Sequence, residues 1–161
     1  REIKAAGKQI ATDVHVISDI DDAYNRDFME HADLLFLSDE NIIGEPETFL
    51  LHLKDRYPAS IIAIGRGEHG ALLYDRKRDE MTRFSAAKVG PVVNTIGAGD
   101  ALFSSFLSYA MRGYSPIEAM IRAETFAALK IRFTGASVGF PSPAEVENAV
   151  ASSAIQIERI H

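Results

Sequence analysis

The residues best suited to chemistry lie in one short segment, Asn94–Asp100 (NTIGAGD). Its glycines allow the backbone to turn tightly and to approach a ligand closely. An apolar helical pattern follows at once, so successive amide N–H groups at the helix N-terminus would form an anion site. Asp100 falls in the first helical turn, where a carboxylate beside a phosphate would accept a proton from an attacking hydroxyl. The alternative is a glycine-rich loop in which Asp100 only stabilises the start of the helix.

A second glycine cluster, Gly65–Gly70 (GRGEHG), directly follows a predicted strand. In open α/β sheets, ligands bind outside the carboxyl ends of the strands. This loop could therefore pass close to a nucleotide, with Arg66 near its phosphates. It could equally be a plain connection from Ile64 to Ala71.

Two familiar phosphate motifs are excluded. After Gly97 and Gly99, Leu102 stands where the dinucleotide-binding fingerprint requires a third glycine. Ala71 follows Gly70 where a P-loop requires lysine. The P-loop mechanism therefore does not apply to this chain.

The elements that must position these glycines alternate between strands and helices. Apolar or β-branched runs predict strands, and amphipathic segments between them predict helices. The strands are expected at 10–17, 33–37 and 60–64, and the helices at 21–31 and 47–57. This order implies parallel pairing with right-handed crossovers. A hairpin is then expected, with strands at 71–74 and 81–84 on either side of a charged turn.

The second half of the sequence is mostly helical. One helix is expected over 99–112, with Gly113 placed to end it. A second begins at Pro116, with Ser115 as its N-cap, and runs to about residue 133. A third begins after Ser142, with Glu145 at capping-box spacing. No repeat or linker interrupts the pattern, so we expect a single α/β domain over residues 1–161.

Composition narrows the class of protein. The chain has 161 residues, 47% of them hydrophobic and 25% charged, as in ordinary globular proteins. The net charge of −6 disfavours a general nucleic-acid partner. No apolar run reaches the roughly 18–20 residues of a membrane span, and no signal peptide opens the sequence. There is no cysteine, which fits a reducing compartment. We therefore expect a cytoplasmic protein without a membrane partner.

The segment 94–103 (NTIGAGDALF) resembles the C-terminal signature of the PfkB carbohydrate kinase family, which includes ribokinase-like sugar and nucleoside kinases. The family pattern is Asp-Thr-x-Gly-Ala-Gly-Asp followed by a helix. Gly67 and Gly70 lie upstream, as in the family, and Gly135-Ala136 followed by Pro141 resembles its closing segment. The resemblance covers essentially the whole chain but only the C-terminal half of a usual member, without the N-terminal half and lid. It implies a ribokinase-like three-layer αβα sandwich with a mostly parallel sheet.

The resemblance also implies an activity. The protein would be an ATP-dependent kinase that transfers the γ-phosphoryl group to a hydroxyl of a sugar, a sugar derivative or a nucleoside. Asp100 matches the catalytic base. Gly97, Ala98 and Gly99 match the anion hole, whose amides stabilise charge on the transferred group. Mg²⁺ would bridge the nucleotide phosphates.

Other positions match the nucleotide site of the family. Thr95 lies in the segment between acceptor and phosphates, and Gly135 matches the loop near adenine. The upstream loop that lines the ATP site is matched by Gly65, Arg66, Gly67 and Gly70.

Three positions depart from the family pattern. Asn94 replaces an Asp that in ribokinase-like members helps to hold a monovalent cation such as K⁺. The segment 38–41 (SDEN) replaces Asn-x-x-Glu, which organises magnesium and phosphates, and Asp39 or Glu40 could substitute. Glu124 stands where Asn or His is usual near adenine. A nucleotide-binding module without turnover is therefore a second hypothesis, and a fold remnant that works through its surface is a third.

Two expectations remain. Asp13 and His15 end a predicted strand, where Asp13 could touch the acceptor or a metal-bound water or be an ordinary strand-end polar residue. No set of metal ligands is identified. A chain that matches only half of the family's fold should have an unpaired strand edge. We expect the N-terminal half of the same protein, or self-association, to cover this edge.

Overall fold

In the computed structural model, which describes residues 4, 6–135 and 137–161, three apolar runs form the parallel strands that the sequence predicts. They are β1 (Ala11–Val16), β2 (Leu34–Ser38) and β3 (Ile61–Gly65). Phe36 of β2 lies opposite Asp13 of β1 and Ala63 of β3. Most positions of β2 and β3 are buried, which explains why their sequences are continuously apolar rather than alternating.

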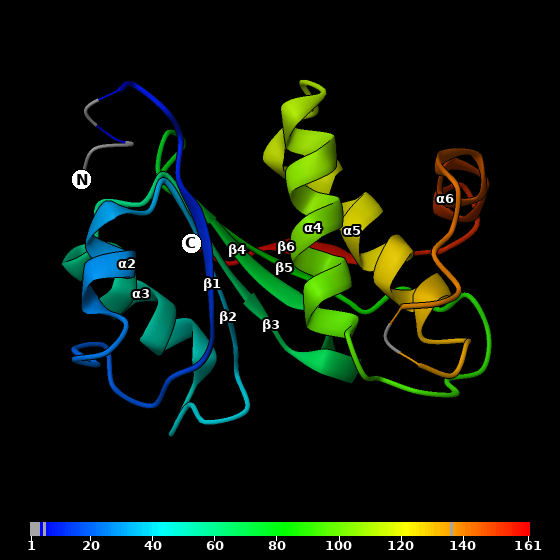
Figure 1. Ribbon diagram of the computed structural model, residues 1–161, viewed down its shortest axis with the longest axis horizontal. Coiled ribbons are helices and arrows are strands. Elements are labelled where there is room, and N and C mark those ends of the chain that lie inside the picture. Colours follow the sequence, from blue (N-terminus) through cyan, green and yellow to red (C-terminus); the bar gives the residue numbers. More distant parts are fainter. Residues whose placement is uncertain (1–3, 5, 136) are drawn as a thin grey trace. The chain divides into compact units, whose positions relative to one another are not determined.

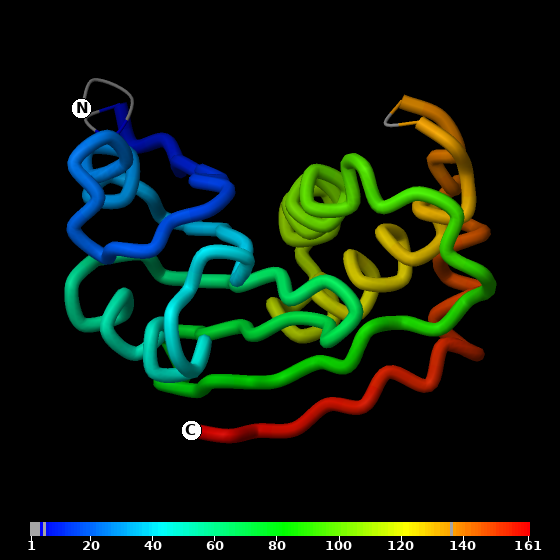
Figure 2. The backbone as a smooth tube through the Cα atoms, turned by 90° about the horizontal axis from the view of Figure 1, so that it is seen from below, coloured from blue at the N-terminus to red at the C-terminus, as the bar shows by residue number. Residues whose placement is uncertain are grey.

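Three further strands complete a sheet with the order β1-β2-β3-β4-β5-β6. They are β4 (Ala71–Asp75), β5 (Glu80–Phe84) and β6 (Ile157–Arg159). Figure 2 shows the red C-terminal segment running beside the green β5 segment, and the Ile160 amide donates to the Met81 carbonyl at 2.9 Å. The sequence analysis did not predict β6. Its three residues are all exposed, so it has no apolar alternation that would mark a strand.

The contacts divide the chain into two compact units. The first contains the described residues up to Arg66, together with Leu72–Arg83 and Arg159–His161. The second contains Gly67–Ala71 and Phe84–Glu158. The single domain over 1–161 stays a prediction.

In the first unit, α2 (Arg26–His31) and α3 (Pro46–Arg56) lie on one face of the strands (Figure 1). Alternate strand residues point toward these helices, as the period of two requires. The resulting core contains Met29, Leu35, Leu37, Leu50, Leu53, Ile62 and Ile64.

Helix α2 is shorter than predicted. The sequence predicts a helix from residue 21, but residues 21–25 form turns or coil and α2 begins at Arg26. The Asp19 and Asp22 carboxylates accept hydrogen bonds from the amides of Asp21 and Asn25, at 2.9 and 2.8 Å. Short acidic side chains that capture nearby amides in this way compete with helix formation.

The second unit is helical, as predicted. It contains α4 (Ala98–Met111), α5 (Pro116–Lys130) and α6 (Pro143–Val150), and α5 packs against both α4 and α6 (Figure 1). Ser115 and Ser142 cap α5 and α6, both in complete capping boxes. Helix α5 ends at Lys130, three residues before the predicted end. Among the described residues, no helix is both long and apolar enough to cross a bilayer.

Candidate active site

The segment before α4 is fixed to the end of α5. The amides of Val93 and Asn94 donate to the carbonyl of Ile131, at 2.9 and 3.0 Å. From the same end of α5, the ammonium group of Lys130 donates to the carbonyl of Ile96. The Asn94 side-chain oxygen accepts from the Ile96 amide at 2.8 Å. These bonds define the path of the backbone into α4.

Gly97 is the N-cap of α4 and has a left-handed backbone, with φ of 77°. No side chain of a described residue caps this helix. The Ala98 amide donates to the Thr95 carbonyl at 3.0 Å. Among the described residues, the amides of Gly97, Gly99 and Asp100 have no acceptor. Free donors at a helix N-terminus, together with the helix dipole, suit an anionic ligand.

Asp100 lies in the first turn of α4 and is exposed. Its carbonyl accepts a hydrogen bond from the Ser104 hydroxyl at 2.6 Å. Within the described part of the chain, no hydrogen bond or ion pair engages its carboxylate. This carboxylate therefore lies within one helical turn of the free amides and is able to accept a proton from a hydroxyl.

Thr95 and Gly135 belong to the same unit as Asp100. Thr95 is exposed, and its carbonyl accepts the Ala98 amide. Gly135 follows α5 in a loop and has a φ of 100°, a backbone that favours glycine. Ala136 lies outside the described residues. No hydrogen bond or ion pair joins Gly135 to residues 94–100 in the described part of the chain.

Gly67 and Gly70 also belong to the second unit, in and directly after the short 3-10 helix Gly67–His69. The Gly70 amide donates to the Gly67 carbonyl at 3.1 Å. Gly70 has a φ of 83°, and a Cβ there would lie 2.1 Å from the carbonyl oxygen of Phe84. The fold thus requires glycine at position 70, whether or not a nucleotide passes nearby.

Gly65 and Arg66 belong to the first unit. The Arg66 guanidinium lies 3.8 Å from Asp39 and 3.5 Å from Glu47. Burial alone would raise the pKa of Glu47, but a hydrogen bond from Arg83 and the charge of Arg66 hold it below its ordinary value. Arg66, which the sequence analysis placed near the nucleotide phosphates, is therefore already close to two carboxylates.

A buried acid and a buried base stand out on α5. Glu124 is almost wholly buried, and burial raises its pKa to about 8. Lys130 is fully buried, and sequence reasoning missed it. A signal was present, because Lys130 follows the buried Ala123 by seven residues and so shares its helix face.

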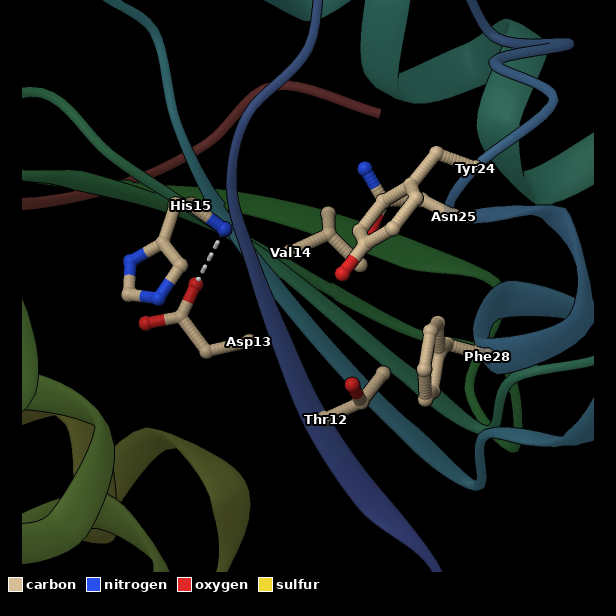
Figure 3. Close-up of a pocket in the computed structure, with 7 residues that line it drawn as sticks. All are labelled: Thr12, Asp13, Val14, His15, Tyr24, Asn25 and Phe28. Atoms are coloured by element: carbon tan, nitrogen blue, oxygen red, sulfur yellow. Dashed lines mark hydrogen bonds between the residues drawn. The ribbon is translucent and has the colours of Figure 1, made fainter.

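Asp13 and His15 lie where β1 becomes irregular. The register with β2 shifts between Asp13 and Val16, and His15 has a positive φ of 57°. The Asp13 carboxylate accepts the His15 amide at 2.8 Å. Asp13 and His15 also line a pocket of about 250 Å³, together with Thr12, Val14, Tyr24, Asn25 and Phe28 (Figure 3). An ordinary strand-end polar residue makes such a local bond, but Asp13 also lines the pocket, so both roles given for it above stay predictions.

Metal ligands do not gather in the described residues. Within residues 4, 6–135 and 137–161, no group of three or more acidic or histidine side chains could hold a metal ion. Asp39, a candidate for organising magnesium, instead lies beside Arg66.

Two curated relatives match part of the sequence. Acarbose 7(IV)-phosphotransferase from Actinoplanes sp. is 34% identical over 116 residues, which are 70% of this chain and 37% of that protein. ATP-dependent 6-phosphofructokinase from Thermoanaerobacterium thermosaccharolyticum is 33% identical over 104 residues, which are 63% of this chain and 31% of that protein. The matched region is thus about a third of either relative.

Solved structures show the fold. The microbiome-derived acarbose kinase Mak1 matches 93% of this chain and 50% of its own, with a TM-score of 0.83 and 24% identity. An Escherichia coli protein described as a ribokinase II, in complex with ATP and Mg²⁺, has a TM-score of 0.79 and 21% identity, over 93% of this chain and 51% of its own. Arabidopsis thaliana ribokinase, complexed with ribose and ATP, has a TM-score of 0.76 and 18% identity, over 92% of this chain and 49% of its own.

These similarities confirm the ribokinase-like α/β fold, and the chain spans about half of each solved structure. The sequence match to a known family is broader than either pairwise match. It extends over residues 3–143, which include the free amides of α4 and Asp100. The chain belongs to the pfkB family of carbohydrate kinases, as its glycine signature predicted.

Proposed function

We propose that this chain carries the catalytic part of an ATP-dependent kinase that phosphorylates a hydroxyl of a sugar, a sugar derivative or a nucleoside. The observation that carries the proposal is the start of α4, where three amides lie within one turn of the carboxylate of Asp100. In the described part of the chain, neither these amides nor this carboxylate has a partner. Family membership makes a sugar kinase the expected class. Four of the five proteins named above have a carbohydrate in their names or were solved with one.

The proposed reaction is an in-line displacement. The acceptor hydroxyl oxygen attacks the γ-phosphorus of ATP, the bond from that phosphorus to the β,γ-bridging oxygen breaks, and ADP leaves. Asp100 takes the hydroxyl proton as the new P–O bond forms. The amides of Gly97, Gly99 and Asp100 donate to the oxygens of the transferred group, where negative charge must be stabilised. Asp100 takes the place of Ala98 in the predicted anion hole, because the Ala98 amide already donates to the Thr95 carbonyl.

The nucleotide and its metal fit this arrangement in different ways. Free amides at the start of α4 suit phosphate oxygens. We propose that Mg²⁺ arrives on the nucleotide phosphates, which it would bridge. The Escherichia coli relative in complex with ATP and Mg²⁺ supports this pairing. The acceptor would be held partly by groups outside this chain, supplied by an N-terminal half of the same protein or by a second copy.

An acceptor screen tests the proposal. The native polypeptide that carries this sequence would be mixed with MgATP and a panel of hexoses, pentoses, sugar phosphates, oligosaccharides and nucleosides, and ADP release would be recorded. We expect release that depends on one acceptor class and equals the phosphorylated product in amount. Nucleotide binding without acceptor-dependent release across the panel would contradict the proposed turnover.

A nucleotide-binding module without turnover is the second candidate. The observation that favours it is the ion pair between Asp39 and Arg66, which engages one of the two residues that could organise magnesium for phosphoryl transfer. Saturable binding of ATP, with no phosphoryl transfer to any acceptor in the same screen, is the result that this candidate requires.

A further inference from the structure

A fully buried lysine donates to the backbone just before the free amides of α4. Lys130 has no exposed surface, and its ammonium group donates to the carbonyl of Ile96. Among the described residues, no carboxylate lies within ion-pair distance of it. A buried cation that donates to a neutral carbonyl, with no ion-pair partner in the described part of the chain, is energetically costly.

The hydrogen bond from Lys130 also sets the direction of the Gly97 amide. A trans peptide is planar, so its C=O and N–H point in opposite directions. The carbonyl of Ile96 and the amide of Gly97 belong to the same peptide. When Lys130 holds the carbonyl toward the end of α5, the Gly97 N–H must point the other way. That N–H is one of the three donors that have no acceptor among the residues the structure describes.

The glycine at position 97 does not by itself fix the orientation of the Ile96–Gly97 peptide. Rotation of the Ile96–Gly97 peptide changes chiefly ψ of Ile96 and φ of Gly97. Because glycine populates negative and positive φ about equally, the φ of 77° at Gly97 is not enforced by its own sterics. A rotated peptide would direct a carbonyl oxygen where the amide now points, and that oxygen would repel an anion.

We propose that Lys130 is a positioning residue for phosphoryl transfer, which holds the Ile96–Gly97 peptide so that the Gly97 amide faces the transferred phosphate. The proposal rests on the proposed function and assigns a role to a residue outside the signature. Lys130 would not touch the substrate. Its buried positive charge, unpaired among the described residues, would also favour an anion at the adjoining helix N-terminus.

Discrimination between nucleotides tests this role. AMP-PNP and ADP would be titrated calorimetrically into the native polypeptide and into Lys130→Met, which removes the charge and the donor but keeps the length of the side chain. The anion hole serves the terminal phosphate, so we expect the AMP-PNP-over-ADP affinity ratio to fall about tenfold or more, as for loss of a charged hydrogen bond. General loosening of the fold would weaken both nucleotides equally and leave the ratio unchanged.

Thr125→Val is the matched control. Thr125 is also fully buried on α5, but its hydroxyl donates to the Ile121 carbonyl of the same helix. We expect this variant to have the same AMP-PNP-over-ADP affinity ratio as the wild-type protein. An unchanged ratio in a folded Lys130→Met protein would overturn the positioning role while leaving the kinase proposal intact. A wild-type protein that binds neither nucleotide would instead contradict the proposed function itself.

A measurement on the wild-type protein covers the case in which Lys130→Met does not fold. In ¹⁵N-glycine-labelled protein, the Gly97 amide resonance should move much further with AMP-PNP than with ADP. A Gly97 resonance that responds equally to both nucleotides, or to neither, would overturn the proposal.

Discussion

The signature departs from the family pattern at Asn94, and the structure shows what this residue still does. Its side-chain oxygen accepts the Ile96 amide at 2.8 Å and so forms the turn before Gly97. An aspartate could make the same bond, but it would add a negative charge close to the proposed phosphate. The substitution therefore keeps the shape of the loop and changes its electrostatics.

Glu124 gives a prediction about pH. The unfolded chain releases this proton near its ordinary pKa of 4.5, whereas the native state keeps it until about pH 8. Raising the pH through this window therefore favours the unfolded state, so the contribution of Glu124 to stability is greatest below pH 4.5 and falls until pH 8. Glu124→Gln removes the titration. As the pH rises from 5 to 8, we expect the free energy of unfolding of the variant to increase by about 3 kcal/mol relative to that of the wild-type protein.

Urea unfolding at both pH values measures this difference. Glu145→Gln is the matched control, because Glu145 is exposed and its pKa is lowered, not raised. A Glu124 variant whose stability follows the wild-type curve across this window would contradict the burial argument.

Sequence reasoning selected the glycines and Asp100 as candidates, but it did not identify the contacts that hold them in place. Local spacing identifies residues 94–100 because loop, glycine and helix start are neighbours in sequence. Lys130 lies 34 positions away from its partner Ile96, and only the packing of α5 brings the two together. The reason for Gly70 was hidden in the same way, since the clash that forbids a side chain comes from Phe84.

At the scale of elements, the start of α5 is well defined because Ser115 and Glu118 form a capping box. The Ser115 hydroxyl accepts the Glu118 amide at 3.3 Å, and the Glu118 carboxylate accepts the Ser115 amide at 3.0 Å. Ser115→Ala should lower the free energy of unfolding by about 1 kcal/mol. Thermal or urea unfolding measures it.

The exposed Ser137 supplies the control for this prediction. Ser137→Ala should leave the unfolding midpoint where the wild-type protein has it. Equal effects of the two substitutions would show that the cap contributes nothing specific to α5.

Element types were predictable and their ends less so. Helices with capping residues, α5 and α6, begin where the sequence predicts. Helix α2 begins five residues later than predicted, because the carboxylates of Asp19 and Asp22 stabilise turns in that segment. Strand β6 was missed because it depends on pairing with β5 rather than on its own pattern.

At the scale of the molecule, β1 lies at one edge of the sheet, and the side chains near it include exposed aromatics. Tyr24 is 82% exposed and Phe28 53% exposed. Open strand edges with apolar neighbours favour association. We therefore predict that the 161-residue chain, produced alone, self-associates. Analytical ultracentrifugation should show species heavier than 17.7 kDa, and a monodisperse monomer would contradict the expectation.

The central claim is that phosphoryl transfer takes place at the start of α4 with Asp100 as the base. The most direct test is the turnover of Asp100→Asn in the native polypeptide, measured with the acceptor that the screen identifies. We predict a loss of about 10²-fold or more in kcat, the usual contribution of a general base, with nucleotide affinity nearly unchanged. Wild-type turnover in this variant would contradict the claim.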